Sequence, residues 1–268
     1  MGTSTNYSGS PNWSPAKNEA TRAGGAGHVT PQKAASVVSG FVAQMARASQ
    51  LGFGTPLSPQ GRNSTATSGG SGSGVGGGGG GGGTRRIAGS ARTVARGVGG
   101  FLADVGTKGF REALAERGLT DLTGKTPDEI ALALADLLGG PASLIEQTAL
   151  RGALMEMVLK WSEGVQGING LIESVTNIAQ NIEGALHDFF GHYIFEVFKT
   201  VGYQGVLATH GFEKANSMAG QIRDFINAKI GGLQASHKLS SVDWNGVSGA
   251  AIVDGIVADT IEIFGEQL

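Results

Sequence analysis

A run of eight consecutive glycines, Gly76 to Gly83, separates two parts of the chain that cannot fold in the same way. The run closes a stretch, residues 51–84, in which Gly, Ser, Thr and Pro predominate. Such a composition offers too little apolar surface to offset the conformational entropy that folding removes. We therefore predict a flexible Gly/Ser-rich linker at 51–84, with the folded body after it.

The distribution of charge follows the same division. Residues 1–111 contain 11 Lys and Arg side chains but only two acidic ones, whereas residues 112–268 contain nine Lys and Arg against 20 acidic ones. The formal net charge of −2 hides this asymmetry. A basic first part next to an acidic body can either fold back on that body or bind an anionic partner.

Apolar residues recur at helical spacing throughout the region that follows the linker. The first segment, 85–105, is basic and amphipathic, because Arg85, Arg92 and Arg96 lie on one side and Val94, Val98 and other apolar residues lie on the opposite side. No run of alternating β-branched residues competes with this pattern. We predict an all-α fold, a single helical domain of about six to seven packed helices at 85–268. The helices expected after the basic one span 108–117, 126–139, 143–161, 171–201, 212–230 and 247–264.

The region before the linker is predicted to be mostly unstructured. Residues 1–29 combine turn-forming residues with few large apolar side chains, which indicates a disordered N-terminal tail that is rich in Gly, Ser and Pro. Thr30 and Pro31 then begin an isolated amphipathic helix at 30–50. Two roles for this helix stay open: a satellite helix that packs loosely on the body, or a docking element for a partner.

Composition limits the chemistry and the location. The chain has no Cys, which removes disulfides, thiol nucleophiles and Cys-ligated metal sites, and which fits a cytoplasmic protein. No signal peptide or transmembrane segment is expected, since no apolar stretch approaches the length that a span needs. The start resembles a myristoylation signal only as far as Asn6, where Ser or Thr is required, so we predict no lipid anchor.

A polar stripe at 188–196 is the strongest candidate for catalysis or metal binding. Asp188, His192 and Glu196 are spaced i, i+4 and i+8, so they share one side of a helix. Apolar residues occupy the other side, which favours interpreting the stripe as a solvated helix face. A hydrolase that uses His192 with Asp188 and Glu196 remains a less favoured hypothesis. We predict no metal site, no cofactor and no enzymatic activity.

A second short motif, Gly124-Lys125-Thr126, matches only the end of a phosphate-binding Walker A loop. That loop requires a glycine five residues before Gly124, and this position is Leu119. Thr126 and Glu129 instead have the spacing of a capping box, with Pro127 in the first helical turn. The motif therefore predicts the start of a helix.

Three segments of the chain resemble one known family. They are the start Met1-Gly2-Thr3-Ser4-Thr5-Asn6-Tyr7-Ser8-Gly9, the stretch Thr84-Arg85-Arg86-Ile87-Ala88-Gly89-Ser90-Ala91-Arg92 that follows the glycine run, and Gly118 to Glu129. Together they resemble the QatB family, a component of the Qat anti-phage defence system. The resemblance covers about half of the chain, in pieces.

The resemblance implies partners within the same system. These are an ATPase, a QueC-like enzyme related to 7-deazaguanine synthesis, and a TatD-like nuclease. It also implies that the QueC-like enzyme modifies the N-terminus, which becomes Gly2 once Met1 is removed. The residue types fit, because a glycine α-amine with a pKa of about 7.7–8.0 is partly unprotonated and nucleophilic near neutral pH.

The candidate docking residues flank the linker on both sides. They are Thr3, Ser4 and Tyr7 in the tail and Arg85, Arg86, Arg92 and Arg96 in the basic helix. An alternative function is binding of nucleic acid or of a membrane surface through Arg85 to Arg96. We favour it less, because the acidic body beside the helix would repel a long polyanion.

Overall fold

The computed structural model describes residues 12–25, 29–50, 82–122, 124–139, 145–233, 242–244 and 246–265. For residues 46–50, 82–89, 145–146 and 265 it describes the backbone alone. The described residues form eleven α-helices and no strand, which confirms the predicted all-α class. Residues 1–11 and 26–28 of the predicted tail, and 51–81 of the predicted linker, lie outside the described residues.

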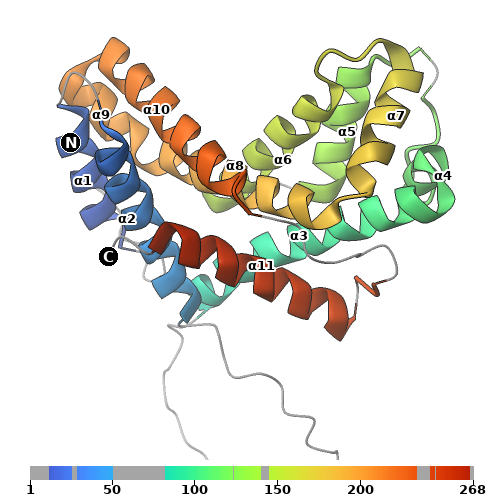
Figure 1. Cartoon of the computed structure of the whole chain (residues 1–268), viewed down its shortest axis with the longest axis horizontal. Helices are drawn as coiled ribbons and strands as arrows, with labels where there is room; N and C mark the ends of the chain where they lie inside the picture. Colours follow the sequence, from blue (N-terminus) through green and yellow to red (C-terminus); the bar gives the residue numbers. More distant parts are fainter. Residues whose placement is uncertain are drawn as a thin grey trace, which may run out of the picture.

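The helices follow one another along the chain with mostly short connections (Figure 1). In order they are α1 (Ser14–Gly24), α2 (Pro31–Gln50), α3 (Gly82–Lys108), α4 (Phe110–Ala115), α5 (Pro127–Gly139), α6 (Ile145–Ser162), α7 (Gly167–Ala179), α8 (Ile182–Val201), α9 (Tyr203–His210), α10 (Phe212–Ile230) and α11 (Val247–Gly265).

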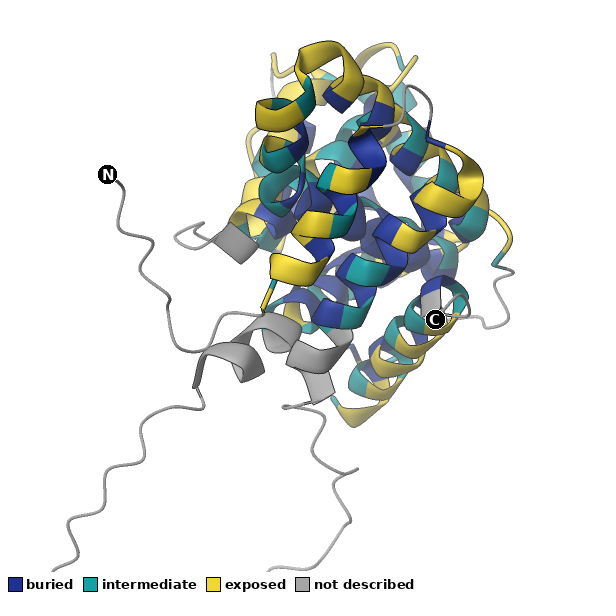
Figure 2. Cartoon of the chain, turned by 90° about the vertical axis from the view of Figure 1, so that its left-hand side faces the viewer, coloured by how far each residue is buried: buried dark blue, intermediate teal, exposed yellow. Residues whose placement is uncertain are grey.

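Helix α8 lies at the centre of the fold. It packs against α2, α3, α6, α10 and α11, and most of its residues are buried. In Figure 1, α9 and α10 lie on one side of α8, α5, α6 and α7 lie on the other, and α3 and α11 run along the base. Figure 2 shows the buried faces of the helices turned inward and the exposed faces turned to solvent. The core is therefore continuous around α8, with Phe189 and Phe190 in contact at 5.2 Å between ring centres.

Helix α1 lies in a segment that the sequence predicts to be disordered. Its contact face consists of small residues, and Ala16, Ala20 and Ala23 are all buried. The ring of Trp13, directly before the helix, lies 5.9 Å from the ring of Phe41. The prediction of a tail over 1–29 is thus wrong for 14–24, because close packing of small side chains against α2 and α9 stabilises a helix that is weakly apolar by itself.

Helix α2 belongs to the core and is not isolated. It packs against α1, α3, α8, α10 and α11, and its apolar side chains Val37, Val38 and Phe41 are almost completely buried. Phe41 meets Phe198 of α8 edge to face, with ring centres 5.8 Å apart. The prediction of a satellite helix that packs loosely on the body is therefore wrong, because the described part of α2 is packed in the core.

Two further helix boundaries differ from the predictions. The helix expected at 171–201 is divided into α7 and α8, and the side chain of Asn181 caps α8 by accepting a hydrogen bond from the backbone N–H of Gly184 at 3.0 Å. Helix α9, between Gly202 and Gly211, was not predicted. At α5, by contrast, the predicted capping box is confirmed. The Thr126 N–H donates to Glu129 Oε2 at 2.8 Å and the Glu129 N–H donates to Thr126 Oγ1 at 3.3 Å.

Candidate functional site

The structure places only some of the predicted docking residues. Gly2, Thr3, Ser4 and Tyr7 lie outside the described residues. Arg85 and Arg86 belong to α3 by their backbone, and their side chains are outside the description. Of the four arginines predicted to dock a partner, the structure therefore shows the side-chain environment of Arg92 and Arg96.

Helix α3 packs against other parts of the fold on two of its faces. Val98 and Phe101 point into the core and are fully buried. On another face, Gly99 leaves room for the indole of Trp244, since a Cβ at this position would lie 2.5 Å from the ring. Glycines that weaken the helix by about 1 kcal/mol each thus give α3 close contact with the segment before α11.

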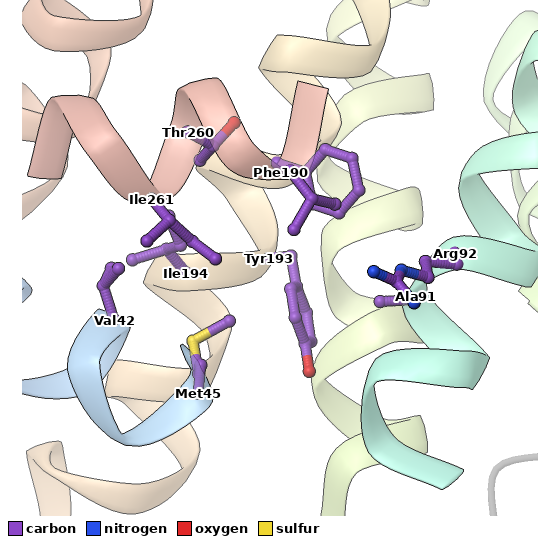
Figure 3. A pocket seen from close by; sticks show the side chains of 10 residues that line it. Val42, Met45, Ala91, Arg92, Phe190, Tyr193, Ile194, Thr260 and Ile261 are labelled. Carbon is purple, nitrogen blue, oxygen red and sulfur yellow. The ribbon is translucent and has the colours of Figure 1, made fainter. Parts of the chain in front are cut away.

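Arg92 pairs with the acidic body. Its Nε lies 2.8 Å from Oδ1 of Asp254 on α11, and the Arg92 side chain is 23% exposed. This contact corresponds to the intramolecular alternative for the basic face. Beside Arg92 lies a small cavity of about 50 Å³ between α2, α3, α8 and α11 (Figure 3). Its other walls are mainly apolar, including Val42, Ile194 and Ile261, and its volume is too small for an organic cofactor.

Arg96 has a different environment, one turn further along α3. It lines an open groove of about 590 Å³ between α3, the end of α5 and residues 242–244. The side chain is half-buried, and among the described residues its guanidinium has no hydrogen-bond or ion-pair partner. The other residues that line the groove are Gly97, Gly100, Ala103, Asp104, Thr107, Arg117, Leu138, Val242, Asp243 and Trp244.

The acidic residue Asp104 in this groove is already neutralised. Its Oδ2 lies 2.6 Å from Nη2 of Arg117 and its Oδ1 lies 3.2 Å from Nζ of Lys108. Burial by itself would raise the pKa of Asp104, but the hydrogen bonds from Arg117 and Lys108 outweigh it, so the pKa is lowered. Lys108 also binds Glu116 at 2.8 Å. The charges around Asp104 are therefore balanced without Arg96.

The three residues of the Asp188, His192 and Glu196 stripe do not meet in one site, because Asp188 pairs with a lysine of α6 while His192 and Glu196 contact a network around Glu156. Asp188 lies 3.4 Å from Nζ of Lys160, and Nδ1 of His192 lies 3.6 Å from Glu156 on α6. Glu196 is only 7% exposed, so the predicted solvated face is wrong at this residue. Helix α6 covers it, and Gly152 of α6 lacks the Cβ that would otherwise lie 2.8 Å from Glu196 Oε2.

Glu156 is the centre of a charge network that joins three helices. Its Oε2 lies 3.6 Å from Nδ1 of His192 on α8, and its Oε1 lies 3.5 Å from Nζ of Lys199 on α8 and 2.9 Å from Nη2 of Arg223 on α10. The polar contact with His192 and the positive charges of Arg223 and Lys199 lower the pKa of Glu156 to about 2. Burial raises the pKa of Glu196, although Lys199 binds it at 2.6 Å. The network holds α6, α8 and α10 together.

His187 is a further buried polar residue that sequence analysis did not single out for a role by itself. It is 3% exposed, and both ring nitrogens lack a hydrogen-bond partner. Burial lowers its pKa, against the opposing effect of Glu183, Asp259 and Asp188. In the described part of the chain, no three His, Asp or Glu side chains are grouped to hold a metal ion. Nor does any helix there combine the length and hydropathy that crossing a membrane requires.

A family model for the Qat anti-phage system associated protein QatB matches residues 78–264. The chain belongs to the QatB family. The QatB match includes α3 to α10 and nearly all of α11, together with both arginines and the charge network, and it leaves α1 and α2 outside. No curated protein and no solved structure matches the chain. Membership of the QatB family makes the chain a component of the Qat anti-phage system.

Proposed function

We propose that this chain is a non-enzymatic component of its defence system that presents Gly2 to the QueC-like enzyme while the helical body binds partner proteins. The docking of α1 on α2 and α9 carries the proposal. It anchors the chain at Ser14, twelve residues after Gly2, on the surface of a body that belongs to the QatB family. The N-terminus is thereby attached to the body at a defined place.

The anchor at α1 is held by specific contacts. Nε2 of His210 on α9 lies 2.7 Å from the carbonyl oxygen of Thr21, and the hydroxyl of Ser36 on α2 donates to Glu19 at 3.1 Å. Gly24 packs so closely on α9 that a Cβ would lie 2.5 Å from Val206. These contacts fix the direction in which the chain enters α1.

The anchor also limits how far Gly2 extends from the body. Twelve residues span at most about 43 Å when fully extended. The QueC-like enzyme must therefore place its active site within that distance of Ser14. Binding of the enzyme to the body near α1, α2 or α9 would satisfy this condition and raise the effective concentration of the N-terminus at the active site.

The chemistry proposed for Gly2 needs only a free α-amine. Removal of Met1 leaves an amine that is partly unprotonated near neutral pH, and glycine carries no side chain to obstruct the enzyme. Within the body, the side chains considered for catalysis contact other residues, Asp188 and Glu196 each a lysine and His192 the carboxylate of Glu156, which supports a binding role. We place this process in the cytoplasm, together with the ATPase and the TatD-like nuclease.

Intact-mass spectrometry tests the modification. The full-length chain is co-expressed with the QueC-like enzyme of the same system or with an inactive variant of that enzyme, and the N-terminal peptide is sequenced by fragmentation. We expect an added mass on the Gly2 amine only with the active enzyme. Ser8→Ala, outside the predicted docking residues, serves as the matched control in the tail and should keep the modification.

A second variant tests the anchor. Deletion of residues 8–11, which leaves Thr3, Ser4 and Tyr7 in place, shortens the maximum reach of Gly2 by about 14 Å and should reduce the modified fraction, whereas replacement of the same four residues by Gly and Ser should preserve it. A chain that differs from its translated sequence only by loss of Met1 would refute the proposed modification.

A further inference from the structure

Among the cations of α3 whose side chains the structure describes, Arg96 is the one without an intramolecular partner. Arg92, one turn earlier, binds Asp254, and Arg117, across the groove, binds Asp104. Within the described residues, the guanidinium of Arg96 makes neither kind of contact, although it lines a groove of about 590 Å³. A half-buried guanidinium without a partner is a site for an oxyanion.

The shape of the groove suits an extended peptide. Its floor is the side of α3 that runs from Arg96 to Thr107, which is about 16 Å long at 1.5 Å per residue. Gly97 and Gly100 add no side chains to this floor, and Leu138 of α5 and Trp244 pack beside them, 3.7 Å and 3.4 Å from where Cβ atoms at these glycines would lie. At about 3.3 Å per residue, five extended residues fit along it.

The charges of the groove select the class of ligand. The lining carries two arginines, Arg96 and Arg117, and two aspartates, Asp104 and Asp243, so its formal charges cancel. Because Arg117 is already paired with Asp104, Arg96 is the arginine of the lining that has no partner among the described residues. A polyphosphate or a nucleic-acid backbone carries more negative charge than one guanidinium balances, whereas a single carboxylate matches it in charge, and its planar shape suits the guanidinium.

We propose that this groove binds a short segment of a partner protein, with one Asp or Glu side chain of that segment paired to Arg96. The proposal rests on the part of the proposed function in which the body binds proteins of its system, and it is independent of Gly2 modification. It also gives Arg92 and Arg96 different roles, because Arg92 stabilises the fold and Arg96 binds a partner.

Binding measurements with purified proteins test the groove. The full-length chain is immobilised and its affinity is measured for the QueC-like enzyme, the ATPase and the TatD-like nuclease of the same system. For at least one of them we expect a loss of about tenfold or more with Arg96→Ala and about 100-fold or more with Arg96→Glu. Arg96→Lys should recover only part of the affinity, since an ammonium lacks the planar fork.

Matched controls separate the groove from general effects of charge and folding. Arg111→Ala removes the same charge from an exposed position on α4 and should change the affinity less than twofold. The thermal midpoints of the Arg96 variants should stay within about 2 °C of the unmodified chain, because no intramolecular partner is lost. The chain has no Cys, so Val242→Cys provides a single thiol at the groove. A bulky maleimide at this position should prevent binding, and the same label on Met155→Cys of α6 should not.

The outcomes distinguish the groove from the proposed function. Unchanged affinity of Arg96→Glu for every partner that binds the unmodified chain would overturn the groove and leave the proposed function in place. Absence of binding to all three proteins would overturn both the groove and the partner-binding part of the proposed function. Salt-sensitive binding of DNA that Arg96→Glu abolishes would overturn the peptide in favour of nucleic acid.

Discussion

The helices outside the family match and the helices inside it are attached to the core by different forces. Helices α1 and α2 attach mainly through small and aromatic side chains, Ala16, Ala20 and Phe41 among them. Within the matched region, α6, α8 and α10 are joined in addition by the ion pairs of Glu156. The comparison teaches that α1 and α2 belong to the same folding unit as the family body, and that acid and salt should affect the two regions unequally.

The largest expected effect comes from removing the aromatic ring that joins α2 to α8. Phe41→Ala should lower the free energy of unfolding by about 3–5 kcal/mol, similar to Phe189→Ala in the centre of the matched region. Urea denaturation followed by circular dichroism measures both values. If α2 were a satellite, Phe41→Ala would cost much less and unfolding would show two transitions. Phe212→Ala is the control, because its side chain is 67% exposed.

Close glycine contacts give the next largest effect, and one such contact is taken from each region. Gly24→Ala directs a Cβ against Val206, and Gly99→Ala directs one against the ring of Trp244, so each should cost about 1–3 kcal/mol. Gly220→Ala in α10 has open space at its Cβ and should stabilise the protein by up to about 1 kcal/mol. Thermal unfolding compares the three. A stabilising Gly24→Ala would show that α1 is not packed as described.

A smaller effect is expected from acid, which should weaken the ion pairs of Glu156 in the matched region and leave the apolar contacts of α1 and α2 unchanged. Because the pKa of Glu156 is lowered from 4.5 to about 2, its stabilisation is fully present above pH 4.5 and is lost as the pH falls towards 2. Glu156→Gln should cost about 1–2 kcal/mol at pH 7 and almost nothing near pH 2. The raised pKa of Glu196 makes its own contribution to stability change with pH in the opposite direction. The quantity to follow is therefore the difference in the free energy of unfolding between the unmodified protein and Glu156→Gln at each pH. A cost that is independent of pH would contradict this role.

The smallest effect concerns the contact between Arg92 and α11. Asp254→Asn removes a partner that is 52% exposed, so we expect a loss below about 1 kcal/mol that disappears in 1 M salt. Differential scanning calorimetry at two salt concentrations measures it. Asp224→Asn in α10 is the matched change of charge, because Asp224 forms no ion pair with any residue that the structure describes. A loss of more than about 2 kcal/mol in the free energy of unfolding would contradict the description of this contact as a weak surface ion pair.

Local sequence patterns predicted much of the fold. The all-α class, the apolar face of α3 and the capping box of α5 follow from spacing within one helix, and the structure confirms them. Helix α1 was missed because its burial depends on contacts between alanines and distant helices. The division at Asn181 had a local signal, since asparagine is a preferred N-cap, and so had α9, which is bounded by Gly202 and Gly211.

The environment of individual charged residues was less predictable. Arg92 and Arg96 share a helix face and have the same local pattern, yet Asp254 lies beside the first and a groove beside the second. Likewise, Glu196 is covered by α6, a helix more than 30 residues earlier in the chain. These differences arise from tertiary packing, which spacing along one helix does not contain. The predicted roles of Gly2, Thr3, Ser4, Tyr7, Arg85 and Arg86 remain predictions.

The packing of α2 against α3 has a consequence for how this gene can change over time. The two helices lie in contact although residues 51–81 separate them in sequence. The entropy of closing such a loop grows only with the logarithm of its length, so that a doubling costs about 0.6 kcal/mol. Insertions and deletions of repeated glycine codons between these helices should therefore be nearly neutral for stability. Natural relatives are expected to vary most in length here, while the distance from the N-terminus to α1 stays within narrow limits.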